Sequence, residues 1–409
     1  MPKVIKQNSQ ELAQKAIDKA AALGRDIDLS HYSTGEDKFE YEEDLSRLPD
    51  DEKASMLSAG VMVDDKSQRS GTFVQKDQTP VHFSTVQEGV EVMSMSEALS
   101  KYSWLDDYRW NVVKVDADKY TAHLELNESD GYFIRTLPGV KAELPVQACL
   151  YLGHKNITQR VHNIVMAEEG SELHIITGCT THPMSAGLHL GVSEFYVKKG
   201  AKLTFTMIHN WASEVEVRPR SGIIVEEDGV FLNNYVSMKP VRSMQMYPTA
   251  HLVGRNALAR FNSVLVAPEG SHIDVGARVI LDAEGARAEI ISRTITTGGT
   301  VIARGDIQAN KPEVIGHLEC NGLILSEGGI IQAVPELIGR VPNVDLSHEA
   351  AVGKIAEEEV EYLMARGLTR DDATAMIVRG FLNVDIEGLP PELEAELKHA
   401  IEESENELF

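Results

Sequence analysis

The chain has 409 residues, of which 43% are hydrophobic and 25% charged, a composition typical of a globular protein with more than one domain. Its formal net charge of −24 argues against a nucleic-acid partner, because binding a phosphate backbone requires Lys and Arg. No apolar run approaches the ~18 residues of a membrane span, and the charged N-terminus lacks the apolar segment of a secretory signal. We therefore expect a cytoplasmic protein without a membrane partner.

Residues 1–118 are predicted to form an N-terminal helical region with one short extended segment. Apolar residues recur at helical spacing over residues 10–23, and a long polar connection follows. Residues 71–86 are predicted to form a short extended segment, and residues 94–110 another helix.

Residues 119–345 are predicted to form a parallel β-helix. Short runs of Val, Ile, Leu and Thr are separated by similar glycine-containing turns, which recur at a nearly fixed interval of half a coil or one coil. A fixed period without helices between the strands is typical of a solenoid whose coils bury their apolar faces on one another. An antiparallel sandwich is the alternative, and the strict spacing disfavours it. The turn glycines are Gly170, Gly200, Gly229, Gly254, Gly270, Gly285, Gly299 and Gly328.

Residues 346–409 are predicted to form a C-terminal helical domain of three helices. The first covers Ile355 to Ala365, the second begins at a cap formed by Thr369 and Asp372, and the third opens at Pro390. The helices carry more apolar positions than a chain end needs, which indicates a docking surface. Their many acidic residues are either a solvated face or a surface that attracts a basic partner.

The coil period brings together residues that are distant in the chain, because residues one coil apart lie about 4.8 Å apart on neighbouring strands. Cys320 is followed one predicted coil later by His348 and Glu349. A thiol beside an imidazole and a carboxylate could bind iron. The alternative is that Cys320 is a buried apolar filler and His348 an entry residue of the first helix.

A second column contains Cys149, Cys179 and His209, which follow one another at equal intervals of one predicted coil. If these side chains face inward, they line the interior of the solenoid. The alternative is a shift of one residue at a bulge, which would turn a side chain outward.

Missing motifs narrow the function further. The chain has no phosphate-binding loop, so it is expected to bind no nucleotide and to hydrolyse no ATP. It also lacks the hydrolase and metalloprotease signatures, and aromatic residues make up only 6% of it. A β-helical polysaccharide enzyme, which needs aromatic platforms and paired carboxylates, is therefore disfavoured.

From Gly71 to Ile401 the sequence resembles the SufB/SufD family of iron–sulfur cluster assembly scaffolds. The resemblance is strongest from Ser347 to Phe381, the run that begins SHEAAVGKI and ends IVRGF. It departs from the family at Asn321, where an acidic residue often follows the cysteine. The other matching segments are residues 88–99 and 130–147, Gly178-Cys179-Thr180, His209-Asn210-Trp211 and Cys320-Asn321-Gly322-Leu323.

The resemblance implies a right-handed β-helix with helical flanks, paired with a second SufB/SufD-type subunit and docked to SufC, an ABC-type ATPase. Cys179 corresponds to the sulfur acceptor, with a path through the interior towards Cys320, and Cys320, His348 and Glu349 correspond to the site of the nascent iron–sulfur cluster. The partner-docking residues would be Ile355, Met376, Ile377 and Phe381. A sulfur donor protein is expected too.

SufD members of the family generally lack the full cysteine set, so the resemblance, with Cys179, Cys320 and Glu349 all present, favours a SufB-like role. We expect such a chain to be a scaffold and not an enzyme. In a minimal system, one SufB-like chain would act as a homodimer together with the ATPase. The sequence leaves open whether the dimer is a homodimer or a heterodimer, and whether Cys149 takes part. The alternative is a SufD-like structural subunit that binds the ATPase without holding a cluster.

Overall fold

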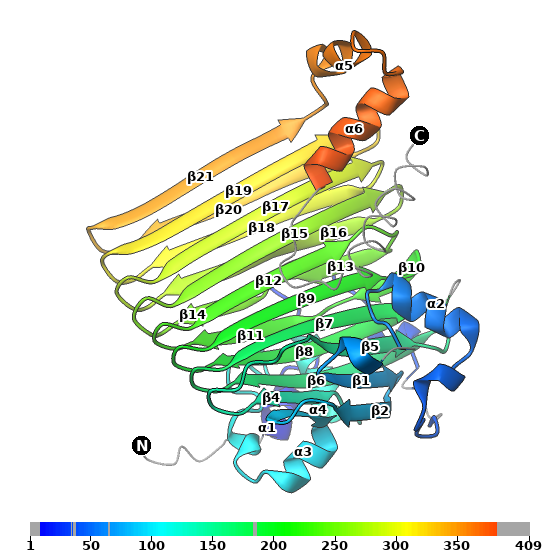
Figure 1. Ribbon diagram of the computed structural model, residues 1–409, viewed down its shortest axis with the longest axis vertical. Coiled ribbons are helices and arrows are strands. Elements are labelled where there is room, and N and C mark those ends of the chain that lie inside the picture. Colours follow the sequence, from blue (N-terminus) through cyan, green and yellow to red (C-terminus); the bar gives the residue numbers. More distant parts are fainter. Residues whose placement is uncertain (1–8, 34, 36–37, 64–65, 183–185, 383–409) are drawn as a thin grey trace.

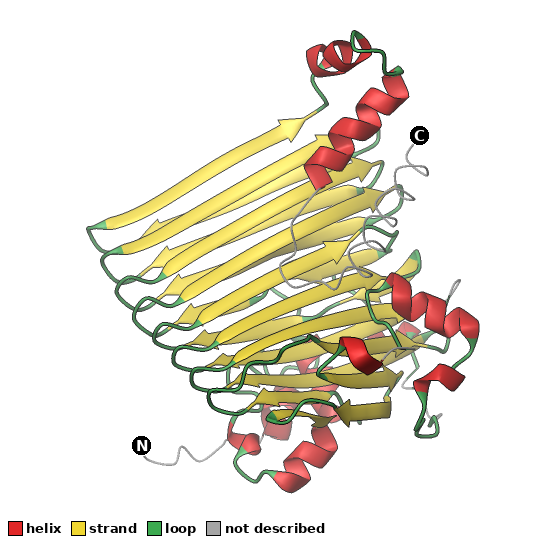
Figure 2. Ribbon diagram, in the orientation of Figure 1, coloured by secondary structure: helices red, strands yellow, loops and turns green. Residues whose placement is uncertain are grey.

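The computed structural model describes residues 9–33, 35, 38–63, 66–182 and 186–382. The helix predicted to open at Pro390 lies outside these residues. Two long sheets dominate the described part, and the chain alternates between them to build a β-solenoid of about eight turns (Figure 1). Helices gather at the two ends of the solenoid (Figure 2). The prediction of a mainly β protein, a parallel β-helix with helical segments at both ends, is confirmed.

The first sheet is parallel throughout except for its antiparallel first pair. Each coil adds one strand to it, so residues one coil apart become neighbours. In sheet order its strands are β2 (Thr79–Thr85), β1 (Gly71–Lys76), β5 (Val146–Leu152), β7 (Glu172–Thr181), β9 (Lys202–Asn210), β12 (Val230–Ser237), β15 (Leu258–Pro268), β17 (Arg287–Thr297), β19 (Val314–Ile324) and β21 (Val344–Gly353).

The second sheet faces the first across the interior. Its strands are β3 (Val90–Ser94), β4 (Tyr132–Thr136), β6 (Ile157–Ala167), β8 (Ala186–Val197), β11 (Arg220–Val225), β14 (Thr249–Leu252), β16 (His272–Leu281), β18 (Thr300–Ala309) and β20 (Ile330–Gly339). Two short strands, β10 (Glu214–Val217) and β13 (Ser243–Met246), lie between β8 and β16 beside β11 and β14. Several corner glycines adopt the left-handed conformation that tight turns require, such as Gly170 and Gly200 with φ of +66° and +63°.

The helices are short. Near the N-terminal end of the solenoid lie α1 (Ser9–Lys15), α2 (Asp50–Ser58), α3 (Met95–Lys101) and α4 (Lys119–Leu126), and after the last strand come α5 (Glu357–Met364) and α6 (Arg370–Leu382) (Figure 1). Single 3-10 turns occur at Leu29–His31, Leu45–Arg47, Lys66–Gln68 and Leu105–Asp107. The predicted cap of the second C-terminal helix is present, since the backbone N–H of Asp372 donates to the Thr369 hydroxyl at 3.1 Å.

The N-terminal region differs from its prediction in content. The segment expected to be helical over 94–110 has only α3 and one 3-10 turn, because its aromatic residues pack on the outside of the second sheet. Strands β1 to β3 belong to the two large sheets, so the sheets begin before residue 119. At the other end, β21 continues past residue 345 to Gly353.

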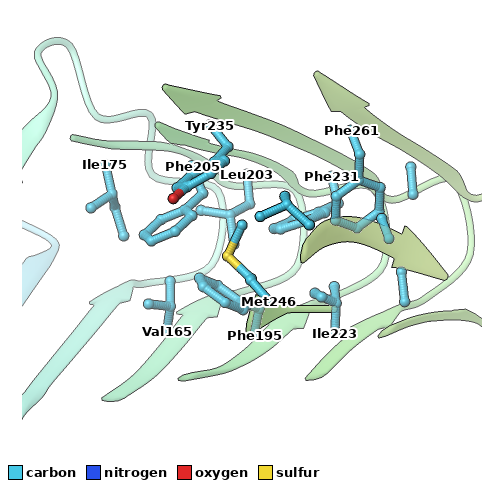
Figure 3. Packing of buried hydrophobic residues seen from close by; sticks show 14 of the residues in the cluster. Val165, Ile175, Phe195, Leu203, Phe205, Ile223, Phe231, Tyr235, Met246 and Phe261 are labelled. Atoms are coloured by element: carbon cyan, nitrogen blue, oxygen red, sulfur yellow. The ribbon is translucent and has the colours of Figure 1, made fainter. Parts of the chain in front are cut away.

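The interior of the solenoid is filled by apolar side chains from both sheets. Phe195 from the second sheet meets Phe205 and Phe231 from the first, with ring centroids 4.7 and 5.5 Å apart (Figure 3). Phe231 in turn lies 5.8 Å from Phe261 one coil later. This ladder of rings joins successive coils and the two sheets, and such close packing makes the core sensitive to lost volume.

We expect Phe205→Ala to lower the free energy of unfolding by about 3–5 kcal/mol, because it leaves a cavity between the sheets. Denaturant unfolding monitored by circular dichroism measures the change. Tyr362→Ala is the matched control, since this aromatic side chain on α5 is 57% exposed and its loss should cost less than about 0.5 kcal/mol. Equal losses in the two variants would contradict the assignment of the ring ladder as the core.

Candidate functional site

Cys179 and His209 are direct partners on neighbouring strands, as the predicted column requires. Cys179 on β7 is in register with His209 on β9, so both side chains point to the same face. Cys179 belongs to the interior core, and His209 is only 2% exposed. This part of the predicted column is therefore present inside the solenoid.

The prediction that Cys149 belongs to the same column is wrong. Cys149 on β5 is in register with Gly178, while Leu150 is the partner of Cys179. The coil between β5 and β7 is thus one residue shorter than the coil between β7 and β9, and a shift of one residue reverses the face of a strand. Cys149 instead packs outside the sheet beneath the N-terminal segment, where burial raises the pKa of its thiol to about 12.

The surroundings of Cys179 are dry and neutral. The thiol is fully buried, and burial raises its pKa well above the usual range of a cysteine. The neighbouring inner position of β7 is Thr177, whose hydroxyl lies 3.4 Å from the hydroxyl of Tyr132. A thiol in such a place stays protonated at neutral pH and becomes a nucleophile only if a neighbour takes its proton.

A cluster of rings lies next to Cys179. His209, His189 and Trp211 contact one another, with ring centroids between 5.1 and 6.4 Å apart. Burial lowers the pKa of His189 to about 3 and that of His209 well below 6.5, so both imidazoles are neutral. Nε2 of His209 and Nε1 of Trp211 are buried without a hydrogen-bond partner, and an unsatisfied buried polar atom usually costs about 1–3 kcal/mol. Such atoms call for a physical explanation, which can be a catalytic role, strain or a bound water.

Cys320 lies near the opposite end of the solenoid on the same inner face of the first sheet. It is in register with Ser292 on β17 and with Ala350 on β21, the last strand. The thiol is 3% exposed, and burial raises its pKa although Ser292 beside it acts in the opposite direction. Only β21 separates Cys320 from this end of the solenoid, which we call the open end because no further strand among the described residues pairs with β21.

His348 and Glu349 lie on the strand next to Cys320, but not at the predicted register. Ala350 is the partner of Cys320, so His348 pairs with Leu318 and Glu349 with Glu319. The register differs from the prediction because the corner loops vary in length from coil to coil. His348 thus shares the inner face with Cys320 at a diagonal position, whereas Glu349 faces outward beside Glu319. Both side chains are exposed.

The predicted ligands do not form a closed metal site within one chain. Across the residues that the structure describes, no three His, Cys, Asp or Glu side chains gather closely enough to hold a metal ion. Cys320 and His348 lie on the inner face of the last two strands of the first sheet.

The predicted docking residues divide into two groups. Phe381 and Ile355 pack against the outer face of the first sheet, in a cluster with Val378 and Leu382 of α6. Ile377 is half-buried, whereas Met376 is 45% exposed on the outer side of α6. The first group attaches the helices to the solenoid, and Met376 is the predicted docking residue that is most accessible to a partner.

Comparison with known proteins agrees with this architecture. Residues 151–381 match the family model described as "SUF system FeS cluster assembly, SufBD core domain". The chain is 56% identical to an iron-sulfur cluster assembly SufBD family protein of Archaeoglobus fulgidus. The 358 aligned residues cover 88% of this chain and 96% of the relative. It is 28% identical to iron-sulfur cluster assembly protein SufB of Bacillus subtilis, over 88% of this chain and 79% of that protein.

The fold and the similarity together define a β-solenoid protein of iron–sulfur cluster assembly. The chain belongs to the SufBD family. A relative from Methanothermobacter thermautotrophicus strain Winter is 50% identical over 400 residues, which cover 96% of this chain and 97% of the relative. Of the described helices, none is long and apolar enough to span a membrane.

Several residues around Cys179 could not be identified from the sequence. His189 on β8 and Met244 on β13 belong to the second sheet and meet His209 and Tyr235 of the first sheet only because the two sheets face each other. Tyr235 lies on β12, next to β9, but at a diagonal position that equal coil spacing does not identify. Coil spacing relates residues within one sheet, so it could find His209 but gives no signal for contacts across the interior.

Proposed function

We propose that this chain is a SufB-like scaffold on which iron–sulfur clusters are assembled. In this proposal Cys179 accepts sulfur from a donor protein, and Cys320 with His348 on the same inner face holds the nascent cluster, while Glu349 would act as a ligand only from the outer face of β21. A SufC-like ATPase docks on the C-terminal helices and supplies the energy of ATP hydrolysis, so the scaffold itself has no ATPase activity. Iron and sulfide are the cargo of this reaction.

The observation that carries the proposal is the alignment of the two inward-facing cysteines. Cys179 and Cys320 lie on the same inner face of the first sheet, five strand steps apart along β7, β9, β12, β15, β17 and β19. At about 4.8 Å per step they are separated by roughly 24 Å. Polar side chains occupy inner positions between them, so the interior offers partners for sulfur along the way. These are His209, Tyr235, Ser237, Ser263, Ser292 and Thr294.

The open end of the solenoid supports pairing with a second subunit. Strands β20 and β21 end the two sheets, and on that side neither pairs with a further described strand. Apolar side chains are exposed there, with Ile330 at 56% and Val352 at 43%. An exposed sheet edge with apolar residues favours pairing with another chain, and a second subunit would complete the ligand set around Cys320.

We expect Val352→Lys to weaken this subunit pairing by at least about tenfold, because an inward-pointing Lys on an edge strand opposes strand addition. Analytical ultracentrifugation over a range of concentrations measures the effect. Val253→Lys is the control, since Val253 is 49% exposed at a corner of the solenoid away from the open end. If both variants dimerise as the wild type does, the open end is not the interface.

A SufD-like structural subunit is the second candidate, and the register of β21 favours it. Glu349 lies on the face opposite to Cys320, so the three predicted ligands do not converge in one chain. A SufD-like subunit would bind the ATPase and the partner subunit without retaining iron or sulfide.

Anaerobic co-purification with the cognate ATPase, followed by reconstitution with ferrous iron and a sulfur source, distinguishes the two functions. The scaffold retains iron and acid-labile sulfide in equimolar amounts, with the absorption of an iron–sulfur cluster. The SufD-like subunit co-purifies with the ATPase but retains neither. Binding of iron without sulfide would contradict the scaffold proposal.

A further inference from the structure

The imidazole next to Cys179 has one nitrogen held in place and the other free. Nδ1 of His209 lies 2.8 Å from the hydroxyl of Tyr235, which extends from β12 on the far side of β9. Nε2 is on the other edge of the ring, buried and without a hydrogen-bond partner. Cys179 is the register partner of His209 on the β7 side. Nε2 and the Cys179 thiol are not hydrogen-bonded to each other, but both side chains point into the interior from paired positions on neighbouring strands.

The contacts of Tyr235 indicate which tautomer His209 adopts. The Tyr235 hydroxyl donates to the sulfur of Met244 at 2.6 Å. With its proton directed there, the hydroxyl oxygen accepts a hydrogen bond from Nδ1–H of His209. Nε2 then carries the lone pair, so the network assigns it the role of an acceptor. The interior thus contains a proton donor, Cys179, and on the paired position of the next strand an imidazole nitrogen whose lone pair has no partner.

We propose that His209 is the base that takes the proton of the Cys179 thiol when sulfur is transferred, and that Tyr235 positions its ring. The inference rests on the proposed function, in which Cys179 receives sulfur. Nε2 takes the proton as Sγ of Cys179 attacks the outer sulfur of a persulfide or polysulfide. A new sulfur–sulfur bond forms at Sγ, and the old one breaks. Its electron pair leaves with the donor sulfur, which then takes the proton from Nε2.

The groups around the pair make an internal base necessary. Besides each other, the titratable side chains near Cys179 and His209 are His189 on β8, Tyr235 on β12 and Tyr132 on β4, all fully buried. Cys149 acts on Cys179 from the outer side of β5. All of these groups are neutral at pH 7. A thiolate without a proton acceptor nearby would be a buried, uncompensated charge.

The test is the rate at which Cys179 gains sulfur at different pH values. The full chain is mixed anaerobically with inorganic polysulfide, and the gain of sulfur on Cys179 is followed by mass spectrometry of its peptide. In the wild type the rate should be nearly independent of pH around and above neutrality, because the proton moves within the site. His209→Gln keeps a polar side chain but has no base, so its rate should fall about 100-fold at pH 7. It should also rise about tenfold per pH unit, as the thiolate fraction does.

Tyr235→Phe tests the positioning role and does not depend on the folding of the His209 variant. Without the hydroxyl, Nδ1 is no longer held, and the rate should fall about tenfold while remaining nearly independent of pH. Tyr132→Phe is the matched control, because it removes another buried hydroxyl near Cys179 that bonds to Thr177 and not to His209. Its rate should equal that of the wild type. Circular dichroism and thermal unfolding check the fold of each variant.

Two results would overturn the inference, and a third would also contradict the proposed role of Cys179 as the sulfur acceptor. If His209→Gln sulfurates Cys179 at the wild-type rate, or slows with an unchanged pH profile, His209 is not the base. If Tyr132→Phe slows the reaction as much as Tyr235→Phe does, Tyr235 has no special positioning role. If the wild-type chain gains no sulfur on Cys179 at any pH, the proposed sulfur acceptor fails as well, which separates the two proposals.

Discussion

Cys320→Ala is expected to abolish retention of iron and acid-labile sulfide while leaving the solenoid folded. Thiolate is the strongest ligand for iron among the predicted residues, and without it the exposed His348 and Glu349 cannot hold a cluster alone. Cys320 lies at the last buried layer next to Ala350, so the lost volume is small and borders the open end. We expect at least a tenfold fall in iron and sulfide per chain after anaerobic reconstitution, measured by colorimetric analysis and visible absorption.

Cys149→Ala is the matched control for this loss. Cys149 is also a buried free thiol on the first sheet, but it faces outward beneath the N-terminal segment. Its removal should cost stability and leave cluster content unchanged. Normal iron and sulfide in Cys320→Ala, with a fold like that of the wild type, would remove the proposed assembly site and favour the SufD-like function.

Met376→Asp is expected to prevent binding of the SufC-like ATPase without unfolding the C-terminal helices. Met376 is exposed on α6, while Val378 and Leu382 attach this helix to the outer face of the first sheet. A charge at an apolar contact in a docking interface is left without its hydration, so affinity should fall by about 100-fold or more. Isothermal titration calorimetry with the purified ATPase measures the change.

The controls for this variant separate docking from helix attachment. Val86→Asp adds the same charge at an apolar position that is 54% exposed near the N-terminal end, and should bind the ATPase normally. Phe381→Asp should also abolish binding, but with a lower unfolding temperature, because Phe381 packs against the sheet. Wild-type affinity in Met376→Asp would exclude α6 as the docking helix.

The β-solenoid could be predicted because its signal is local and repeated. Corner glycines such as Gly170 and Gly200 recur along the coils, and they hold the left-handed conformation that a tight turn needs. The cap of α6 at Thr369 was predictable for the same reason, since it depends on two residues three positions apart. The helix expected over 94–110 was mostly wrong, because tertiary packing of its aromatic residues outweighed their local preference.

The sites were predictable only as far as the strand register was. Cys179 and His209 are partners because the coil between their strands has the predicted length. The coil after Cys149 is shorter than predicted, which pairs this cysteine with Gly178 and turns it outward. The coil after Cys320 is longer than predicted, which pairs it with Ala350 and leaves His348 at a diagonal position. The corner loops that set these lengths leave no clear mark in the sequence.

The amino-acid sequence was enough to predict the repeating coil and the helical segments at both ends, and to single out Cys179 and Cys320 as candidates for sulfur chemistry. The folded structure was needed to show which face each cysteine occupies and which groups meet across the interior, such as Tyr235 with Met244. The physical reason is that a strand alternates faces at every residue, whereas the length of a coil varies slightly from one coil to the next. The face to which a side chain points therefore depends on loop lengths and on packing between the sheets, and no local sequence pattern predicts either of them.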